Sequence, residues 1–303
     1  MTGLTDFITE GRWADILLIW LVTVDDAYQR LEQRHGHWRR SGPAPRFSDS
    51  EVITVSLFID TYFHGHEALG LSFLRQYHLD LFPHLLPNGQ FNARRRALDA
   101  LSEQIRQDLT RQFGLIDAEQ DLRLVDSAPI PVCTYGRAGR NRTLVGPEYF
   151  GVMTNRKAKL YGLRLYVLTT PEQVIDRWLL APASRRDCKL LPDILENCSG
   201  LNVFADNAYV DPLEADRLAR YQDITLFATP AKNVQQPWSD EFRKLANRLR
   251  RQIESTIGVL ATVFRVEQPG ARSLSGLTAR IATRILAYTL CFITGPILAR
   301  LQP

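Results

Sequence analysis

The chain has 303 residues and a formal net charge of +4; 45% of its residues are hydrophobic and 23% are charged. These values are typical of a globular protein with one large or two ordinary domains, and they exclude a disordered chain and a chain that is basic throughout. The four cysteines form no Cys-x-x-Cys pair, which argues against a zinc ribbon or a disulfide scaffold and fits a reducing cytoplasm.

Residues 1–12 have no basic stretch ahead of an apolar run, so the sequence predicts no signal peptide. Two apolar runs, WADILLIWLVTV and ILAYTLCFITGPILA, are short for a bilayer crossing and are predicted to form buried core helices. We therefore expect a soluble, cytoplasmic protein with no membrane partner.

Residues 1–115 are predicted to be helical. The pattern favours helices over 12–34, 51–63, 68–78 and 91–113, the second of which has Ser48 as its N-cap and Glu51 as the capping-box partner. All six histidines lie in the first 84 residues, so a catalytic centre later in the chain cannot use a histidine base, a Ser-His-Asp triad or a His-bound zinc. For His64 and His66 we expect an ordinary loop or helix-end role, because no further ligands lie at metal-site spacing.

Three arginines, Arg94, Arg95 and Arg96, crowd the first turn of the predicted helix 91–113, where the helix dipole disfavours cations. They form either a solvated face or an anion-binding surface that contacts DNA phosphates or base edges, as in a helix-turn-helix protein. We favour the second interpretation because of the residues that follow, and we predict that 1–115 is a DNA-end-binding region.

From about residue 120 the pattern changes to strands. It predicts strands at 122–126, 159–170, 174–182, 201–206 and 223–231, with helices at 184–200, 212–221 and 239–264. Three strands followed by alternating helices and strands indicate a mixed sheet with helices around it, an α/β (α+β) fold that matches a ribonuclease H-like domain in outline. We assign 116–303, the C-terminal helix included, to this domain.

Two aspartates stand where predicted strands end, Asp126 in RLVDSAPI and Asp206 in VFADNAY. If the first and fourth strands are neighbours, both carboxylates emerge at the edge of the sheet where ligands bind in open α/β folds. The alternative for Asp206 is a turn aspartate. Asp211 has a simpler explanation, because Asp-Pro-Leu-Glu is a typical helix start with Asp211 as the N-cap.

Two carboxylates held close together repel each other unless a cation lies between them, and Mg²⁺ prefers oxygen ligands of this kind. A pair of such ions can promote phosphoryl transfer without any histidine. Glu254, beside the apolar stripe of the helix 239–264, is a candidate third ligand. The alternative is a solvated ion pair with Arg250 or Arg251.

The segment 134–159 is strongly basic, with glycines and aromatic residues interleaved, which favours contact with a phosphate backbone. Its candidate DNA contacts are Arg137, Arg140, Arg142, Arg156, Lys157 and Lys159. Trp238 either stacks on an unpaired base or packs against Phe242 at the entrance to the following helix.

The stretches RLVDSAPIPV, ADNAYVD and RRQIESTIGVL, in this order, resemble the DDE-type transposases of bacterial insertion sequences, and most closely the branch named after insertion sequence 982. The resemblance extends to APASRRDCKLLPDIL, RKAKLYGLRL and much of the N-terminal region. It implies that Asp126, Asp206 and Glu254 form a metal-binding catalytic triad and that Arg250 or Arg251 contacts DNA. The longer Tyr-Arg-Glu-Lys signature of some relatives is incomplete, since position 247 is Asn and position 261 is Ala.

The resemblance therefore implies a transposase that cuts and joins DNA at the ends of a mobile element. Its expected cofactor is a pair of Mg²⁺ ions, for which Mn²⁺ can substitute. Its expected partners are the terminal inverted repeats, the target DNA and a second copy of the chain in a synaptic complex, with the protein in the bacterial cytoplasm and on the nucleoid when bound to DNA. The alternatives are a metal-dependent DNA nuclease of the same fold and a catalytically inert DNA-binding protein derived from a transposase.

Overall fold

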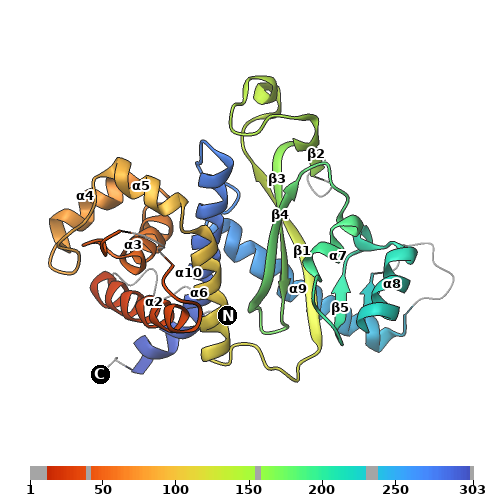
Figure 1. The fold of residues 1–303 in the computed structure, drawn as a ribbon. Helices are drawn as coiled ribbons and strands as arrows, with labels where there is room; N and C mark the ends of the chain where they lie inside the picture. The colour runs from red at the N-terminus through yellow and green to blue at the C-terminus, as the bar shows by residue number, and fades with distance from the viewer. Residues whose placement is uncertain (1–11, 39–41, 154–157, 230–237, 301–303) are drawn as a thin grey trace. The chain divides into compact units, whose positions relative to one another are not determined.

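The structure, a computed structural model, describes residues 12–38, 42–153, 158–229 and 238–300 (Figure 1). The chain forms two compact units. One, the helical unit, contains residues 1–115 together with 262–303, and the other, the sheet unit, contains 116–261. The fold is mixed α/β, with a helical N-terminal region and a mixed sheet, as the sequence predicts.

The helical unit is built from six helices within the described residues: α2 (Trp13–His35), α3 (Asp49–Tyr62), α4 (Glu67–Tyr77), α5 (Asn88–Arg96), α6 (Asp99–Gln112) and α10 (Leu274–Arg300). The capping box at the start of α3 is confirmed: the Glu51 backbone N–H donates to Ser48 Oγ at 3.1 Å, and the Ser48 N–H donates to the Glu51 carboxylate at 2.6 Å. Helix α3 is buried along almost its whole length, so it forms the centre of this unit.

The prediction of one continuous helix over 91–113 is wrong. The chain leaves helical geometry at Leu98 (φ −112°, ψ 13°), and this residue is 5% exposed, so α5 and α6 are separate helices joined by a buried corner. Apolar side chains at helical spacing are nevertheless buried on both sides of the break, at Phe91, Leu101, Ile105 and Leu109, whereas Phe113 at the end is 47% exposed. As a consequence, the three arginines lie in the last turn of α5, where the helix dipole favours cations.

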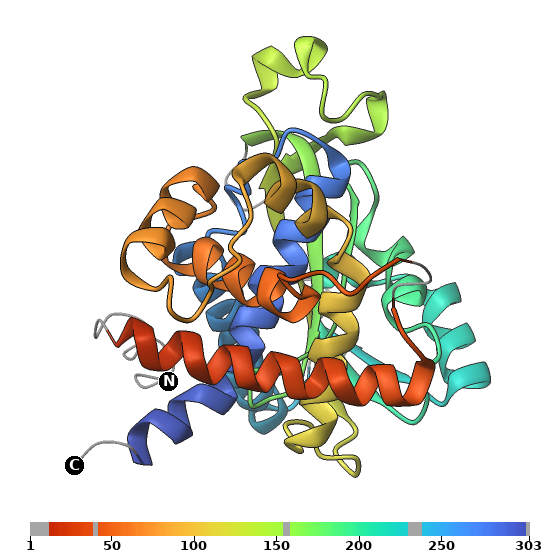
Figure 2. The same ribbon diagram turned by 60° about the vertical axis from the view of Figure 1, so that its left-hand side comes forward.

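Helix α10 packs into the helical unit, although the sequence analysis grouped it with the sheet. It lies beside α6 and contacts α2 and α3 (Figures 1 and 2). The indole N–H of Trp20 on α2 donates to Thr294 Oγ1 on α10 at 3.0 Å, and both residues are fully buried. The physical reason is the apolar surface of α10, which is buried on nearly every side and therefore needs other helices around it.

By length and composition alone, α10 could cross a membrane, and it is the one such helix in the described part of the chain. However, 78% of its most apolar window is buried inside the protein, as in the core helices of soluble proteins. The predicted core-helix role fits this burial, although the helix of 27 residues is longer than the apolar run suggested.

The sheet unit contains the strands β1 (Leu122–Pro131), β2 (Phe150–Met153), β3 (Ala158–Thr169), β4 (Ile175–Pro182), β5 (Asn202–Ala205) and β6 (Thr225–Ala228). The sheet order is β2-β3-β1-β5-β6, with β4 also paired to β3. Strands β1, β5 and β6 are parallel to one another, and β3 is antiparallel to β1, β2 and β4. The predicted neighbourhood of the first strand and the strand at 201–206 is therefore confirmed.

The two faces of the sheet have different coverings. One face packs against α7 (Leu191–Ile194) and α8 (Pro212–Gln222) through a buried cluster that includes Val125, Tyr166 and Val203. On the other face, Phe204 and Phe227 stack at 4.9 Å between ring centroids, and both lie against Phe242 of α9 (Asp240–Thr262).

Two features of this unit differ from the prediction. Strand β2 lies inside the segment that was predicted as a basic loop. The helix predicted at 184–200 is reduced to the single turn of η4 (Asp187–Lys189), a 3-10 helix, and the short α7. The local reason is the ion pairing and burial of this segment against the sheet, which hold it in short turns.

Candidate active site

The strand predicted to end at Asp126 continues to Pro131, so Asp126 lies in the middle of β1, two residues past the last residue of β1 that pairs with β5. Its Oδ1 accepts a hydrogen bond from the Ser127 backbone N–H at 2.7 Å, and Oδ2 accepts none from the described residues. Burial is the main cause that raises the pKa of its carboxyl group from the usual 3.8 to about 7. The negative charges of Asp206, Asp187 and Glu254 add to this effect.

Asp206 follows directly after β5 and is partly buried. Its Oδ1 accepts a hydrogen bond from the Ala208 N–H at 2.7 Å and thereby caps the single turn of η5 (Asn207–Tyr209). The turn role considered for this residue is therefore present in the structure. Burial also raises the pKa of Asp206, with a contribution from the charge of Asp187, whereas Arg250 and Arg164 oppose the shift.

The register of the sheet brings the two aspartates to the same end and the same face. Leu124 of β1 pairs with Phe204 of β5, and Asp126 and Asp206 each follow two residues later along the parallel strands. Because side chains alternate along a strand, Asp126 and Asp206 share the face of Leu124 and Phe204. The ring of Phe204 contacts Phe242 of α9 with 5.7 Å between centroids, so this is the face that α9 covers.

Glu254 is presented by α9 and is ion-paired with Arg250, whose Nε lies 2.8 Å from Glu254 Oε1. The solvated ion pair considered in the sequence analysis is thus present, and both side chains are about half exposed. The pair still interacts electrostatically with the two aspartates. The charge of Glu254 raises the pKa of Asp126, and the charges of Asp206 and Asp126 raise the pKa of Arg250. Arg251 is also exposed.

These observations bear on whether the carboxylates fit a divalent cation. Within the part of the chain that the structure describes, no three Asp, Glu, His or Cys side chains converge closely enough to hold an ion. However, the donors are oxygens only, as Mg²⁺ prefers, and each aspartate keeps Oδ2 without a donor from the described residues. Partial burial of the Asp126 carboxylate next to other negative charges is also unfavourable unless a cation compensates it.

Tyr209 adds an unsatisfied polar atom to this environment. Its side chain is 1% exposed, and its hydroxyl has no hydrogen-bond partner among the described residues. Burial raises its pKa well above 10, and the charges of Asp126, Asp187 and Asp206 all act on the phenol. A buried hydroxyl without a partner costs about 1–3 kcal/mol, which a bound water near the carboxylates would recover. The donors are therefore of the oxygen type that a hydrated divalent cation takes, but among the described residues no three carboxylates converge on one point.

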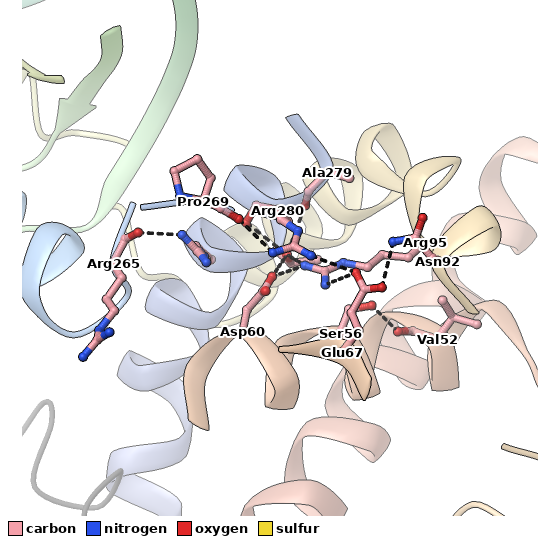
Figure 3. A network of polar contacts seen from close by, with 12 residues as sticks. Val52, Ser56, Asp60, Glu67, Asn92, Arg95, Arg265, Pro269, Ala279 and Arg280 are labelled. Carbon is pink, nitrogen blue, oxygen red and sulfur yellow. Dashed lines mark hydrogen bonds and ion pairs between the residues drawn. The ribbon is translucent and has the colours of Figure 1, made fainter. Parts of the chain in front are cut away.

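The structure contradicts the prediction that Arg95 contacts DNA. Arg95 is 3% exposed, and its guanidinium is ion-paired with the buried carboxylates of Asp60 and Glu67 (Figure 3). Arg280 also donates to Glu67, at 3.1 Å, so the network ties α3, α4, α5 and α10 together. A side chain in this position stabilises the helical unit and does not reach a nucleic acid.

Of the other two arginines, Arg94 is also largely engaged in the fold. Its guanidinium donates to the Phe47 carbonyl and is ion-paired with Asp49, which is 4% exposed. Arg96 is exposed and remains available to a ligand. The crowding of three arginines thus has a mostly structural origin, because two of them neutralise buried aspartates.

The predicted basic segment is partly ordered by its aromatic residues. Arg137 and Arg140 lie in η1 (Tyr135–Arg140), and they and Arg142 are exposed. The Lys159 ammonium lies 5.0 Å from the centroid of the Tyr135 ring, a cation–π contact. Arg156 and Lys157 lie outside the described residues.

Trp238 packs edge-to-face on Phe242, with 4.8 Å between ring centroids, so the packing alternative is present at the entrance to α9. Among the exposed cations of the same helix are Lys244, Arg248 and Arg251. Their spacing of four and three residues places them on one side of the helix, and we call them the basic stripe of α9. The signal was present in the sequence as helical spacing.

A profile of the family described as Transposase DDE domain matches residues 117–274, which is just over half of the chain. Comparison with curated proteins gives no match. Comparison with solved structures gives none either. The matched region includes the whole sheet unit apart from its first residue, with Asp126, Asp206 and Glu254. The mixed sheet described above is accordingly a ribonuclease H-like domain, and the chain belongs to the Transposase DDE domain family.

Proposed function

We propose that the protein is a transposase of a bacterial insertion sequence, of the branch named after insertion sequence 982, and that it cleaves the ends of its element and transfers them to new DNA. The observation that carries this proposal is the position of Asp126 and Asp206, each two residues past the last paired residues of the parallel strands β1 and β5, on the face covered by the helix that bears Glu254. The family match supports the same activity.

The residues proposed to hold two Mg²⁺ ions, or Mn²⁺ in their place, are Asp126, Asp206 and Glu254. Proteins of this family usually use a divalent metal. When bound, the metal supplies charge neutralisation for the attacking and leaving oxygens of a phosphodiester. The Ser127 and Ala208 N–H groups each bind one oxygen of an aspartate and thereby orient the other oxygen. Arg250 is the preferred basic contact beside the glutamate, because it lies within the field of both aspartates.

DNA binding is proposed for the exposed cations of the sheet unit and for Arg96. The basic stripe of α9 is well suited to follow a phosphate backbone beside the carboxylates. The helical unit is proposed to bind the terminal inverted repeats, and a homodimer is proposed to hold two ends together. We place the protein in the bacterial cytoplasm, and on the nucleoid when it is bound to DNA.

The test is Mg²⁺-dependent nicking of supercoiled plasmid at low salt by the wild-type protein and by Asp206→Asn. Asp211→Asn, five residues further along the chain than Asp206, is the matched control, since the Asp211 carboxylate caps α8 and pairs with Lys189. We expect cleavage by the wild type and the control, and none by Asp206→Asn with DNA binding retained. Equal cleavage by Asp206→Asn would remove the proposed triad.

A second assay separates the proposal from its two alternatives. With labelled element ends, a transposase joins the 3′ ends to a target molecule, whereas a nuclease of the same fold releases cut ends only. An inert DNA-binding protein shifts the labelled ends in a gel without cutting them. Joined products therefore favour transposition over both other functions.

A further inference from the structure

A fourth carboxylate, Asp187, lies at the aspartate end of the sheet and has no role in the proposed triad. It begins η4, five residues after the end of β4, and its side chain is 14% exposed. The Tyr166 hydroxyl donates to Asp187 Oδ1 at 2.6 Å, and Arg164 Nη1 donates to its two oxygens at 3.0 and 3.3 Å. Both partners belong to β3, so Asp187 is fixed to the sheet in one orientation.

The contacts of its neighbours place Asp187 near the end of β5. Tyr166, which binds it, is the cross-strand partner of Ser127 and points into the cluster under α7 and α8, on the face opposite to the Asp126 side chain. On the other side, η4 packs against η5, the turn that Asp206 caps. Two residues after Asp187, the Lys189 ammonium lies 2.8 Å from Asp211 at the start of α8. Asp187 is thus held by Tyr166 and Arg164 of β3 and lies in a turn that packs against the turn capped by Asp206.

The electrostatics agree with this placement. The charge of Asp187 acts on both Asp126 and Asp206, and that of Arg164 acts on Asp206 in the opposite sense. The buried hydroxyl of Tyr209, which has no hydrogen-bond partner among the described residues, lies in the field of all three aspartates, and a water bound there would satisfy it. A negative charge next to such a ligand increases the attraction for a divalent cation that keeps several of its waters.

We propose that Asp187 is a positioning residue of the carboxylate site: held by Arg164 and Tyr166, it attracts a hydrated divalent cation to Asp126 and Asp206. The inference rests on the proposed function, because it assumes that these two aspartates bind the cation. Carboxylates that act on a metal from outside its ligand shell typically change its affinity 10–100-fold when they are removed. Arg164 limits the effect by partly neutralising Asp187.

The experiment measures Mn²⁺ binding to the full chain by the electron paramagnetic resonance signal of free Mn²⁺, without DNA and at pH 8. Asp187→Asn keeps the acceptor for Tyr166 and removes the charge, and we expect about 10-fold weaker binding. Arg164→Gln removes the neutralising cation, and we expect several-fold tighter binding. Asp176→Asn, another aspartate that accepts a bond from an arginine on this sheet, is the matched control and should bind as the wild type does.

The proposal predicts changes in Mn²⁺ affinity of opposite sign in Asp187→Asn and Arg164→Gln. If Asp187 only stabilised the fold, Mn²⁺ binding would weaken in both variants or in neither. Wild-type affinity in folded Asp187→Asn would overturn the inference, as would weaker binding in folded Arg164→Gln. Circular dichroism checks the fold, and if Asp187→Asn does not fold, the sign for Arg164→Gln decides. Asp206→Asn is the reference for the proposed function. If it binds Mn²⁺ as the wild type does, the proposed metal site is wrong. If Asp206→Asn loses Mn²⁺ affinity but Asp187→Asn keeps it, only the role of Asp187 is rejected.

Discussion

Replacing Asp126 by Asn is expected to stabilise the metal-free protein. In the folded chain, burial raises the pKa of this carboxyl from 3.8 to about 7. Below pH 3.8 the group is neutral in both the folded and unfolded states. As the pH rises, the unfolded chain releases the proton first, so the free energy of unfolding falls until about pH 7 and is then constant. Asparagine has no such titration and avoids the penalty.

The size of the effect follows from the pKa. Each tenfold change in an equilibrium constant corresponds to about 1.4 kcal/mol, so the penalty reaches about 4 kcal/mol at pH 8 and less than about 2 kcal/mol at pH 5. We therefore expect Asp126→Asn to exceed the wild type in free energy of unfolding by this order at pH 8, with a gain that shrinks by about half or more at pH 5. Asp216→Asn, at an exposed site on α8, should change stability by less than about 0.5 kcal/mol.

The assay is urea unfolding in EDTA at both pH values, with hydrogen exchange of β1 and β5 amides to assign the change to the sheet unit. Added Mn²⁺ should raise the stability of the wild type and leave Asp126→Asn unchanged, because the ligand binds the folded state of one protein only. A variant that is no more stable than the wild type at pH 8, or whose gain does not depend on pH, would refute the reasoning.

Three further results are expected. Arg95→Ala leaves Asp60 buried without its cation and should lower the free energy of unfolding in urea by about 3–5 kcal/mol. Arg96→Ala, at the neighbouring exposed residue, should lower it by less than about 0.5 kcal/mol. Equal losses in the two variants would contradict the structural role of Arg95. Thr294→Val removes the acceptor of the Trp20 N–H and should lower the thermal stability by about 1–3 kcal/mol, and an unchanged melting temperature would count against that buried bond. Replacing the basic stripe of α9 by Gln should reduce the slope of log affinity for DNA against log salt by up to about 3, as filter binding over a salt series would show; an unchanged slope would place the DNA elsewhere.

Features of the fold that depend on residues close together in the sequence were predicted correctly. The predicted capping residues Ser48 and Asp211 each accept a hydrogen bond from a backbone N–H of the helix that follows. The apolar runs likewise located β1, β3, β4, β5 and β6, although β2 was missed and β1 extends beyond its predicted end. That β1 and β5 are neighbours was a condition in the sequence argument, and the register of the sheet meets it.

Features that depend on distant residues could not be predicted in this way. Helical periodicity continues across Leu98, and only the packing of α5 and α6 against other helices reveals the break. Arginines that neutralise buried carboxylates look the same in sequence as arginines that bind DNA, which is why Arg95 was misassigned. Asp187 lies 61 residues after Asp126 in an unremarkable turn, and its position becomes visible only through Tyr166 and Arg164.

The return of α10 to the N-terminal helices affects the order in which the protein folds during synthesis. The sheet unit is continuous in sequence and can fold once residue 261 has left the ribosome, but the helical unit lacks a central partner until residues 274–300 have followed. At about 5–20 residues per second, α2 and α3 wait many seconds with their apolar surfaces incompletely covered. The nascent chain therefore completes its ribonuclease H-like domain before its helical unit, and the early helices are the part that most needs chaperone protection during translation.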